Sequence, residues 1–260
     1  MTDRSAETLP LSVFLITRDE AARLPATLAP LVFAGQIVVV DSGSTDRTCE
    51  IAQTAGAEVY HRDWDGYGPQ KGFAEDKCIF DWRLNLDADE VVTPALSAEI
   101  RALFADGPPQ PGAFRVRILN VYPGDAHPRP LAADYRVVRL YHREAGRYRR
   151  HALFDRVELS GEAEEAELNA PIYHHPLLSW HHMVEKENRY TSFQAQSARS
   201  RGPFVLVLRL VAEFPIAFLK FYVLRRHCLG GWKGLAFAMI AAFSRWLRIA
   251  KLLERADRKE

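Results

Sequence analysis

The sequence predicts an α/β fold: a mostly parallel sheet flanked by helices, followed by amphipathic helices at the C-terminal end. Two observations predict the sheet. Strand-like and helix-like segments alternate up to Glu90, which is the pattern of a parallel sheet with helices on both faces. The β-branched run Ile37–Val40 is apolar throughout, as expected for a strand that is buried on both faces.

The elements of this first part follow from apolar spacing and turn residues. The expected strands are Val13–Ile16, Ile37–Val40, Glu58–His61 and a strand that ends at Leu86. Helices are expected between them, over Glu20–Val32, over a segment that ends at Ala55, and over Gln70–Ile79. Pro25 would distort the opening turns of the first helix, and Gly56 is the expected C-terminal cap of the second.

Past Pro94 the alternation stops. A loop rich in Pro and Gly covers Gly107–Gly112, and strand-like segments follow at Ala113–Leu119 and Tyr135–Tyr141. The stretch Met183–Arg199 has the pattern of a polar helix, and Gly202-Pro203 would stop it.

Length and composition limit the number of domains. A chain of 260 residues is one large domain or two small ones. Hydrophobic residues make up 48% of it and charged residues 26%, as in ordered globular proteins. We expect residues 1–200 to form the domain that carries the sheet and the ligand site, and residues 201–260 to form a basic amphipathic tail that associates with a membrane.

The charge of the chain is unevenly distributed. Between residues 199 and 260, 13 Lys or Arg residues stand against four Asp or Glu residues, an excess of nine positive charges, although the whole chain carries only +1. Apolar runs in this tail are interrupted by charges, and none reaches the ~20 residues of a spanning helix. Helices of this kind suit the interface of a membrane with anionic headgroups, although core helices with solvated basic faces would have a similar pattern. No nucleic-acid-binding motif accompanies the basic residues, so we expect no nucleic acid partner.

The N-terminal residues and the cysteines predict a cytoplasmic location. Met1–Pro10 lacks the basic segment and apolar run of a secretory signal. Three scattered cysteines, Cys49, Cys78 and Cys228, give no disulfide framework. They are expected to be buried thiols in a reducing compartment.

Two acidic clusters each close an apolar run. Asp41–Asp46 follows one strand and Asp87–Glu90 follows another, so both lie at strand C-terminal ends, the edge where open α/β sheets bind ligands. Asp87 and Asp89 are two residues apart, and on a strand end their side chains would leave the same face. Two hard oxygen donors suit Mg²⁺ or Mn²⁺ bridging to phosphates. The same acids could instead cap the helices that follow, but the paired clusters favour a nucleotide site.

These residues resemble a known family. The match consists of four ordered blocks, Leu15–Glu20, Val38–Asp46, Trp64–Lys71 and Trp82–Glu90, and weaker similarity at Lys186–Thr191 and Gly231–Gly234. The chain resembles the inverting glycosyltransferases of family 2, which have the Rossmann-like GT-A fold and use nucleotide-diphosphate sugars. More narrowly, it is similar to the bacterial lipopolysaccharide core glycosyltransferases that transfer glucose to an inner-core heptose.

The resemblance implies a role for each matching residue. The loop after the first strand would border the nucleotide through Thr17, Asp19 and Glu20. Asp41 matches the residue that contacts the uracil, and Lys71 matches a basic residue beside the nucleotide. Asp87 matches the acid near the ribose, and Asp89 the metal ligand that bridges the diphosphate.

The family supplies its catalytic base from a His-Glu or His-Asp pair followed shortly by Val. The nearest match is Phe154-Asp155-Arg156-Val157, so Asp155 is the expected base and Phe154 replaces the usual His. Glu158 is the alternative base, and a surface ion pair is the alternative role for Asp155. Of the paired histidines we select His175 as a further site residue.

Together these features predict a cytoplasmic enzyme, peripheral to the inner face of the membrane. It would transfer a hexose, most simply glucose from UDP-glucose, to a lipid-linked saccharide with inversion and with a divalent metal. Two alternatives stay open: a nucleotidyltransferase, and a noncatalytic nucleotide-sugar sensor or membrane adaptor. The second is suggested by Phe154, which replaces the expected His, and by Gly230, which stands where the resemblance implies an Asp.

Overall fold

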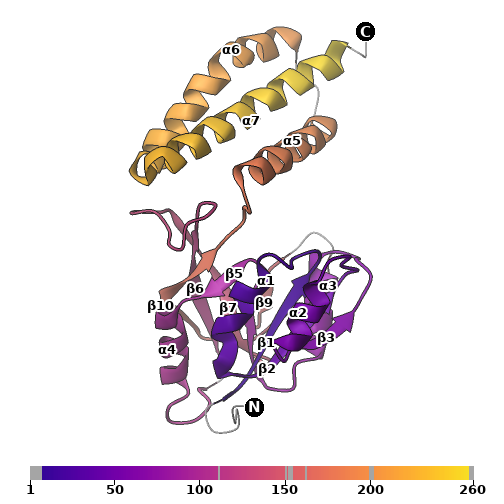
Figure 1. Cartoon of the computed structure of the whole chain (residues 1–260), viewed down its shortest axis with the longest axis vertical. Coiled ribbons are helices and arrows are strands. Elements are labelled where there is room, and N and C mark those ends of the chain that lie inside the picture. Colours follow the sequence, from indigo (N-terminus) through magenta and orange to yellow (C-terminus); the bar gives the residue numbers. More distant parts are fainter. Residues whose placement is uncertain are drawn as a thin grey trace. The chain divides into compact units, whose positions relative to one another are not determined.

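A computed structural model gives the fold of the chain (Figure 1) and describes residues 8–110, 112–149, 151, 155–161, 163–198 and 202–257. The chain forms two compact units. Unit 1 comprises residues 1–119 and 134–175, and unit 2 comprises residues 120–133 and 176–260. The functional division into residues 1–200 and 201–260 stays a prediction.

Unit 1 is built around an eight-stranded sheet in the order β3-β2-β1-β4-β7-β6-β10-β5. The first four of these strands are parallel: β3 (Glu58–His61), β2 (Ala34–Asp41), β1 (Leu9–Thr17) and β4 (Trp82–Asn85). All four were predicted, and the α/β class is confirmed.

The other half of the sheet is antiparallel where its pairing is described. The strand β7 (Asp134–His142) pairs with β4 and with β6 (Ala113–Asn120), and β10 (Glu165–His174) pairs with β5 (Glu90–Val92). A small separate sheet pairs β8 (Gly146–Tyr148) with β9 (Val157–Leu159).

Strand β2 is covered on both faces, as its continuous apolar run predicts. Val39 packs into one hydrophobic core, whereas Val38 and Val40 pack into a second one, because successive side chains of a strand point to opposite faces. This double burial fixes where the strand ends and therefore where Asp41 emerges.

The first helix of unit 1 begins later than expected, whereas the helix predicted over Gln70–Ile79 begins earlier, at Tyr67. The segment predicted over Glu20–Val32 is instead α1 (Leu24–Leu28) followed by the 3₁₀ helix η1 (Ala29–Phe33). Pro25 occupies the first turn of α1, where its missing N–H leaves no hydrogen bond unmade. The residues before it therefore stay in the loop that borders the candidate site.

The remaining helices of unit 1 are α2 (Thr48–Thr54), α3 (Tyr67–Asp76) and α4 (Pro94–Leu103). Gly56 follows α2 with φ +82, which agrees with its predicted capping role. The cysteines fit their prediction only in part: Cys78 is buried and Cys49 is half-buried, but Cys228, in a short helix of unit 2, is exposed.

Unit 2 is helical. It contains α5 (Trp180–Ser197), α6 (Pro203–Leu219), the π-helical turn η2 (Lys220–Leu224), the 3₁₀ turn η3 (His227–Gly230) and α7 (Gly231–Asp257). The long helix α7 packs against both α5 and α6. Among the described residues, none of these helices combines the length and the apolar character needed to cross a membrane.

A close contact inside unit 2 depends on glycine. A Cβ atom built on Gly234 would lie 1.8 Å from the carbonyl oxygen of His227, and one built on Gly230 would lie 2.7 Å from the ring of Tyr122. Any side chain at Gly230 would therefore have to displace this ring.

We expect Gly234→Ala to destabilise unit 2 by about 1–3 kcal/mol, because the backbone of η3 would have to move to admit one methyl group. Urea unfolding followed by helical circular dichroism measures the effect. Gly202→Ala is the control, since nothing lies within 4 Å of a Cβ atom at that position. Equal unfolding curves for the two variants would contradict the tight contact.

Candidate active site

The loops that follow β1 and β2 are joined by side-chain hydrogen bonds. Asp41, only 3% exposed, accepts backbone N–H bonds from Gly43 at 2.9 Å and Ser44 at 2.8 Å, and its other oxygen accepts from Thr17 Oγ1 at 3.1 Å. Burial by itself raises the pKa of Asp41, but the hydrogen bonds from Ser44, Gly43 and Thr17 outweigh it and hold the pKa below its usual value. Asp41 is therefore an anion that orders the loop after β2.

The second link between these loops comes from Asp19. Its carboxylate accepts from Thr45 N at 2.7 Å and from Thr45 Oγ1 at 3.1 Å, and its own N–H donates to Ser44 Oγ at 2.8 Å. Asp19 adopts φ +53, a left-handed conformation that Asp tolerates better than most residues. The residues expected to border the nucleotide thus form one ordered rim.

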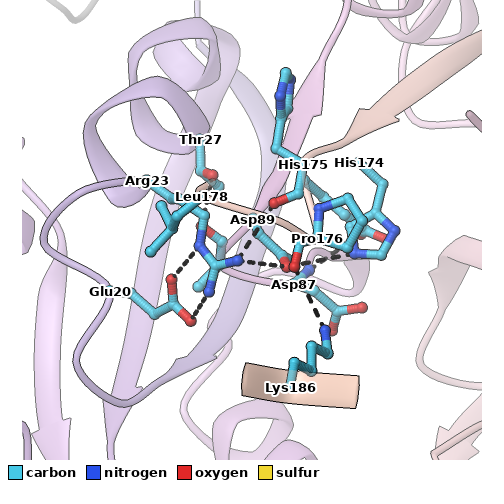
Figure 2. Close-up of polar contacts among 12 residues, drawn as sticks. Glu20, Arg23, Thr27, Asp87, Asp89, His174, His175, Pro176, Leu178 and Lys186 are labelled. Atoms are coloured by element: carbon cyan, nitrogen blue, oxygen red, sulfur yellow. Dashed lines mark hydrogen bonds and ion pairs between the residues drawn. The ribbon is translucent and has the colours of Figure 1, made fainter. Parts of the chain in front are cut away.

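Arg23 connects this rim to the second acidic cluster (Figure 2). Its Nε and Nη2 donate to the two carboxylate oxygens of Glu20, at 2.7 and 2.5 Å, and its Nη1 lies 3.3 Å from both Asp89 Oδ2 and the carbonyl oxygen of His175. Burial raises the pKa of Glu20 despite the guanidinium. The sequence analysis did not single out Arg23.

Asp89 lies between Arg23 and His174. Its Oδ2 is 3.4 Å from His174 Nε2, and its side chain is 18% exposed. Burial alone would raise the pKa of Asp89, but His174 and Arg23 lower it, and burial alone would lower the pKa of His174, but Asp89 raises it. The pair thus favours an ionised carboxylate.

The imidazole beside Asp89 belongs to His174, whereas the sequence analysis selected His175. The backbone N–H of His175 donates to the carbonyl oxygen of Asp89 at 2.8 Å, and its ring points away from the carboxylate (Figure 2). Adjacent residues at a strand end face opposite ways, so only one of the two rings can reach the acid.

Asp87 is held by two buried cations. Lys71 Nζ lies 2.8 Å from Oδ1 and Arg139 Nη2 lies 2.7 Å from Oδ2, and both cationic side chains are almost fully buried whereas that of Asp87 is 33% exposed. Burial would raise the pKa of Asp87, but Arg139 and Lys71 hold it far below its usual value. Asp87 therefore presents a fixed negative charge at the surface of the site.

The same cations contact further acids. Arg139 also donates to Glu90 at 2.5 Å and to Asn85 Oδ1 at 2.7 Å, and Tyr148 donates to Asn85 Oδ1 at 2.7 Å. Glu90 is fully buried, and burial raises its pKa although Arg139 opposes the shift. Breaking such a buried charge network is costly, because it leaves a buried charge without a partner.

Asp155 belongs to this network. Its Oδ1 lies 2.7 Å from Lys71 Nζ, and its side chain is 39% exposed. Burial by itself would lower the pKa of Lys71, but Tyr148, Asp87 and Asp155 raise it above its ordinary value, so Lys71 bridges two carboxylates as an ammonium ion. Phe154, which replaces the family's His, lies outside the described residues.

The second acidic cluster differs from the expected geometry. Strand β4 ends at Asn85, and the chain then turns, with Glu90 N–H donating to the carbonyl oxygen of Asp87 at 3.0 Å. Asp87 and Asp89 therefore do not extend from one face of a strand. The turn directs Asp87 to Lys71 and Arg139, and Asp89 to Arg23 and His174.

The donors around Asp89 fit a divalent ion that arrives with a diphosphate. No group of three or more His, Cys, Asp or Glu side chains gathers for a metal within the described part of the chain. A carboxylate and an imidazole do adjoin at Asp89 and His174. Mg²⁺ is commonly held by one or two carboxylates, with phosphate oxygens and water completing its shell, and Asp89 supplies one such carboxylate.

Comparisons with known proteins show the family of this chain. Residues 12–157 match the family described as Glycosyl transferase family 2. An uncharacterized glycosyltransferase of Rickettsia prowazekii is 34% identical over 93% of this chain and 86% of its own length. The lipopolysaccharide core biosynthesis glycosyltransferase LpsC of Rhizobium meliloti is 30% identical over 95% of this chain and 93% of its own.

Solved structures are more distantly similar. TarS of S. aureus, residues 1–349, is 12% identical, with a TM-score of 0.46 over 96% of this chain and 92% of that one. Glucosyl-3-phosphoglycerate synthase of Mycobacterium tuberculosis, solved with Mn²⁺, UDP and glucosyl-3-phosphoglycerate, is 22% identical, with a TM-score of 0.34 over 46% of each chain. The family match covers more than half of this chain and includes the rim, the acidic clusters and Asp155, and the chain therefore belongs to glycosyl transferase family 2.

Proposed function

We propose that this glycosyltransferase transfers a hexose, glucose from UDP-glucose, to a lipid-linked saccharide of the lipopolysaccharide core, with inversion and with Mg²⁺ or Mn²⁺. The observation that supports it best is the pair of ionised carboxylates, Asp87 and Asp89, at the C-terminal edge of the parallel strands. The similarity to LpsC, named as a lipopolysaccharide core glycosyltransferase, supports the acceptor.

In this proposal the rim and the acids bind the donor. The loop ordered by Asp41 and Asp19 borders the nucleotide, Asp87 faces the ribose, and Asp89, oriented by His174, would hold the metal ion. When bound, the ion neutralises the charge that develops on the departing nucleoside diphosphate. Arg23 lies 3.3 Å from Asp89 and can compensate its negative charge before the donor binds.

Asp155 acts in this proposal as the general base. The hydroxyl oxygen of the acceptor forms a bond to the anomeric carbon while the bond from that carbon to the diphosphate breaks, and the hydroxyl proton passes to the Asp155 carboxylate. Lys71, 2.7 Å from Asp155 Oδ1, holds the carboxylate in place, and its contact with Asp87 links the position of the base to the donor site.

The test is UDP release from a panel of UDP-sugars with Mg²⁺ or Mn²⁺, with and without detergent-extracted core lipopolysaccharide. We expect acceptor-stimulated, metal-dependent release with UDP-glucose. Binding of UDP-glucose without turnover for any acceptor would favour a noncatalytic sensor instead. Release with a different UDP-sugar, and none with UDP-glucose, would identify that other sugar as the donor.

We also propose that unit 2 attaches the enzyme to the cytoplasmic face of a membrane through the apolar side chains that α6 and α7 expose. They include Phe204 (81% exposed) and Val211 (77%) on α6, and Trp232 (66%) on α7. Isolated exposed apolar residues need no explanation, but a series along two helices of a basic tail, in which α7 carries most of the Lys and Arg residues, suits an interfacial position.

Val211→Glu should weaken binding to phosphatidylglycerol vesicles roughly tenfold, because burying Val in the interface contributes about 1.5–3 kcal/mol and Glu adds repulsion. Vesicle co-sedimentation measures the effect. Val32→Glu is the matched control, since Val32 is 64% exposed but belongs to unit 1. Equal sedimentation of the two variants would argue against attachment through α6.

A further inference from the structure

Unit 2 contains a cavity of about 460 Å³ whose lining comes entirely from its own residues. The lining is contributed by the segment 120–133, by α5, by the η2–η3 region and by α7. Its volume lies within the ~300–1,000 Å³ of small-molecule sites. None of the roles proposed above uses this cavity.

The lining carries an excess of positive charge. One carboxylate, Glu187, stands among the side chains Arg129, Lys186, Arg225, Arg245 and Arg248. Arg245 is neutralised by Glu213, 2.7 Å away and outside the lining. Glu187 accepts a hydrogen bond from Ser244 Oγ at 2.7 Å. Arg129, Lys186 and Arg225 by themselves outnumber this carboxylate, so the cavity favours an anionic ligand.

Arg129 is held in place by hydrogen bonds to backbone carbonyl oxygens. Its Nη2 donates to the carbonyl oxygen of Arg225 at 2.8 Å and its Nη1 donates to that of Leu131 at 3.0 Å. Carbonyl oxygens carry no net charge, so these bonds position the guanidinium and keep its charge. Burial, together with Arg129 and Arg225, lowers the pKa of His227 to about 4, in agreement with a positive potential here.

Aromatic rings and neutral polar groups complete the lining. Tyr122 OH lies 2.5 Å from His227 Nδ1, the imidazole stacks on Phe237 at 4.4 Å between centroids, and Tyr190 lines another part of the wall. Flat aromatic faces with polar edges pack well against ligands that are apolar on one face and polar at their edge. Thr191, Gln194 and Ser244 also line the cavity and can bond hydroxyl groups.

We infer that this cavity binds a saccharide that carries a carboxylate or phosphate group, with the anion at Arg129 and Arg225 and the sugar against the aromatic rings. The inference rests on the proposed transfer function in one respect, namely that this acidic sugar is part of the acceptor. Guanidinium groups suit both anions because their N–H fork matches carboxylate and phosphate oxygens.

The binding test uses glucose 6-phosphate, glucuronate, glucose and inorganic phosphate as probes, with calorimetry on the full chain. We expect saturable binding of one or both charged sugars, at least tenfold tighter than glucose or phosphate alone. Arg225→Gln should weaken it about tenfold, and Lys220→Gln should not. Lys220 provides the matched control because it is an exposed cation of unit 2 outside the cavity. The preferred probe distinguishes carboxylate from phosphate.

A kinetic arm separates this inference from the proposed function. With core lipopolysaccharide as acceptor, Arg225→Gln should raise the acceptor KM about tenfold and leave the UDP-glucose KM unchanged. If the wild type fails to transfer but still binds charged sugars through Arg225, the proposed function is wrong and the cavity assignment stands.

Four results would overturn the assignment. If glucose binds as tightly as glucose 6-phosphate, charge does not determine the binding. If inorganic phosphate binds as tightly as glucose 6-phosphate, the sugar does not contribute to it. Equal effects of Arg225→Gln and Lys220→Gln on binding would show that the charged sugar does not bind in this cavity. A loss of binding to phosphatidylglycerol vesicles in Arg225→Gln, without loss of sugar phosphate binding, would identify a lipid headgroup site instead.

Discussion

Asp89→Asn should lower acceptor-dependent UDP release by about a thousandfold or more, equivalent to ~4 kcal/mol of lost transition-state stabilisation. Asn keeps the size and one oxygen of the side chain but removes the negative charge that the proposed metal ion needs. The fold should survive, because Arg23 keeps its two hydrogen bonds to Glu20 when the carboxylate at Asp89 is lost.

The measurement is the rate of UDP release as a function of Mn²⁺ concentration, with Mn²⁺ binding followed separately by electron paramagnetic resonance. Asp106→Asn is the matched control, since Asp106 is an exposed acid of unit 1 in the turn after α4. Normal turnover of Asp89→Asn at ordinary metal concentrations would remove Asp89 from the metal site. Loss of turnover with unchanged Mn²⁺ binding would show that the metal ion binds at other residues.

The sequence predicted the acidic half of this site because the acids follow directly on apolar strands. Asp41 closes β2, and Asp87 and Asp89 follow β4, so a local pattern was enough to bring them to one edge of the sheet. The same local pattern predicted the four parallel strands, and it is clearest in β2 and β1, where Ile37–Val40 and Val13–Ile16 are uninterrupted apolar runs.

Lys71 was identified through the family resemblance, but the other cationic groups could not be predicted from local patterns, since their positions depend on pairing between distant strands. Arg139 reaches Asp87 only because β7 lies antiparallel beside β4, and the register that pairs His174 with Glu90 brings His174 to Asp89. A single Arg between Val138 and Leu140 was the one available signal, because a charge inside an apolar strand needs a buried partner.

Local sequence patterns also could not predict the helix boundaries or the extent of unit 2. Pro25 was recognised as a disturbance, but whether it distorts a helix or begins one depends on the loop before it, which Asp19 and Glu20 tie to the loop after β2. The segment Asn120–Ala133 joins the helices of unit 2 although it lies between two strands of unit 1, and its prolines and glycine mark it only as a loop.

Loss of the proposed general base, Asp155, is expected to have the second largest effect on transfer. Asp155→Asn should retain UDP-glucose binding and lose transfer by about 10²–10⁴-fold, the usual contribution of a positioned general base. Lys71 would keep its ion pair with Asp87 at 2.8 Å, so the buried cation is not left without a partner and the donor site should stay intact.

Glu158→Gln is the discriminating companion, because Glu158 is the nearest alternative carboxylate and pairs with Arg149 at 3.1 Å on the exposed strand β9. A large loss of kcat in Asp155→Asn with near-normal Glu158→Gln assigns the base to Asp155. The reverse result assigns it to Glu158 and leaves Asp155 as a structural partner of Lys71. Since Lys71 joins Asp155 to Asp87, a second signature is expected only if Asp155 is the base: the loss should fall on kcat and leave the UDP-glucose KM within about twofold of the wild type, whereas disturbance of the network through Lys71 would change both.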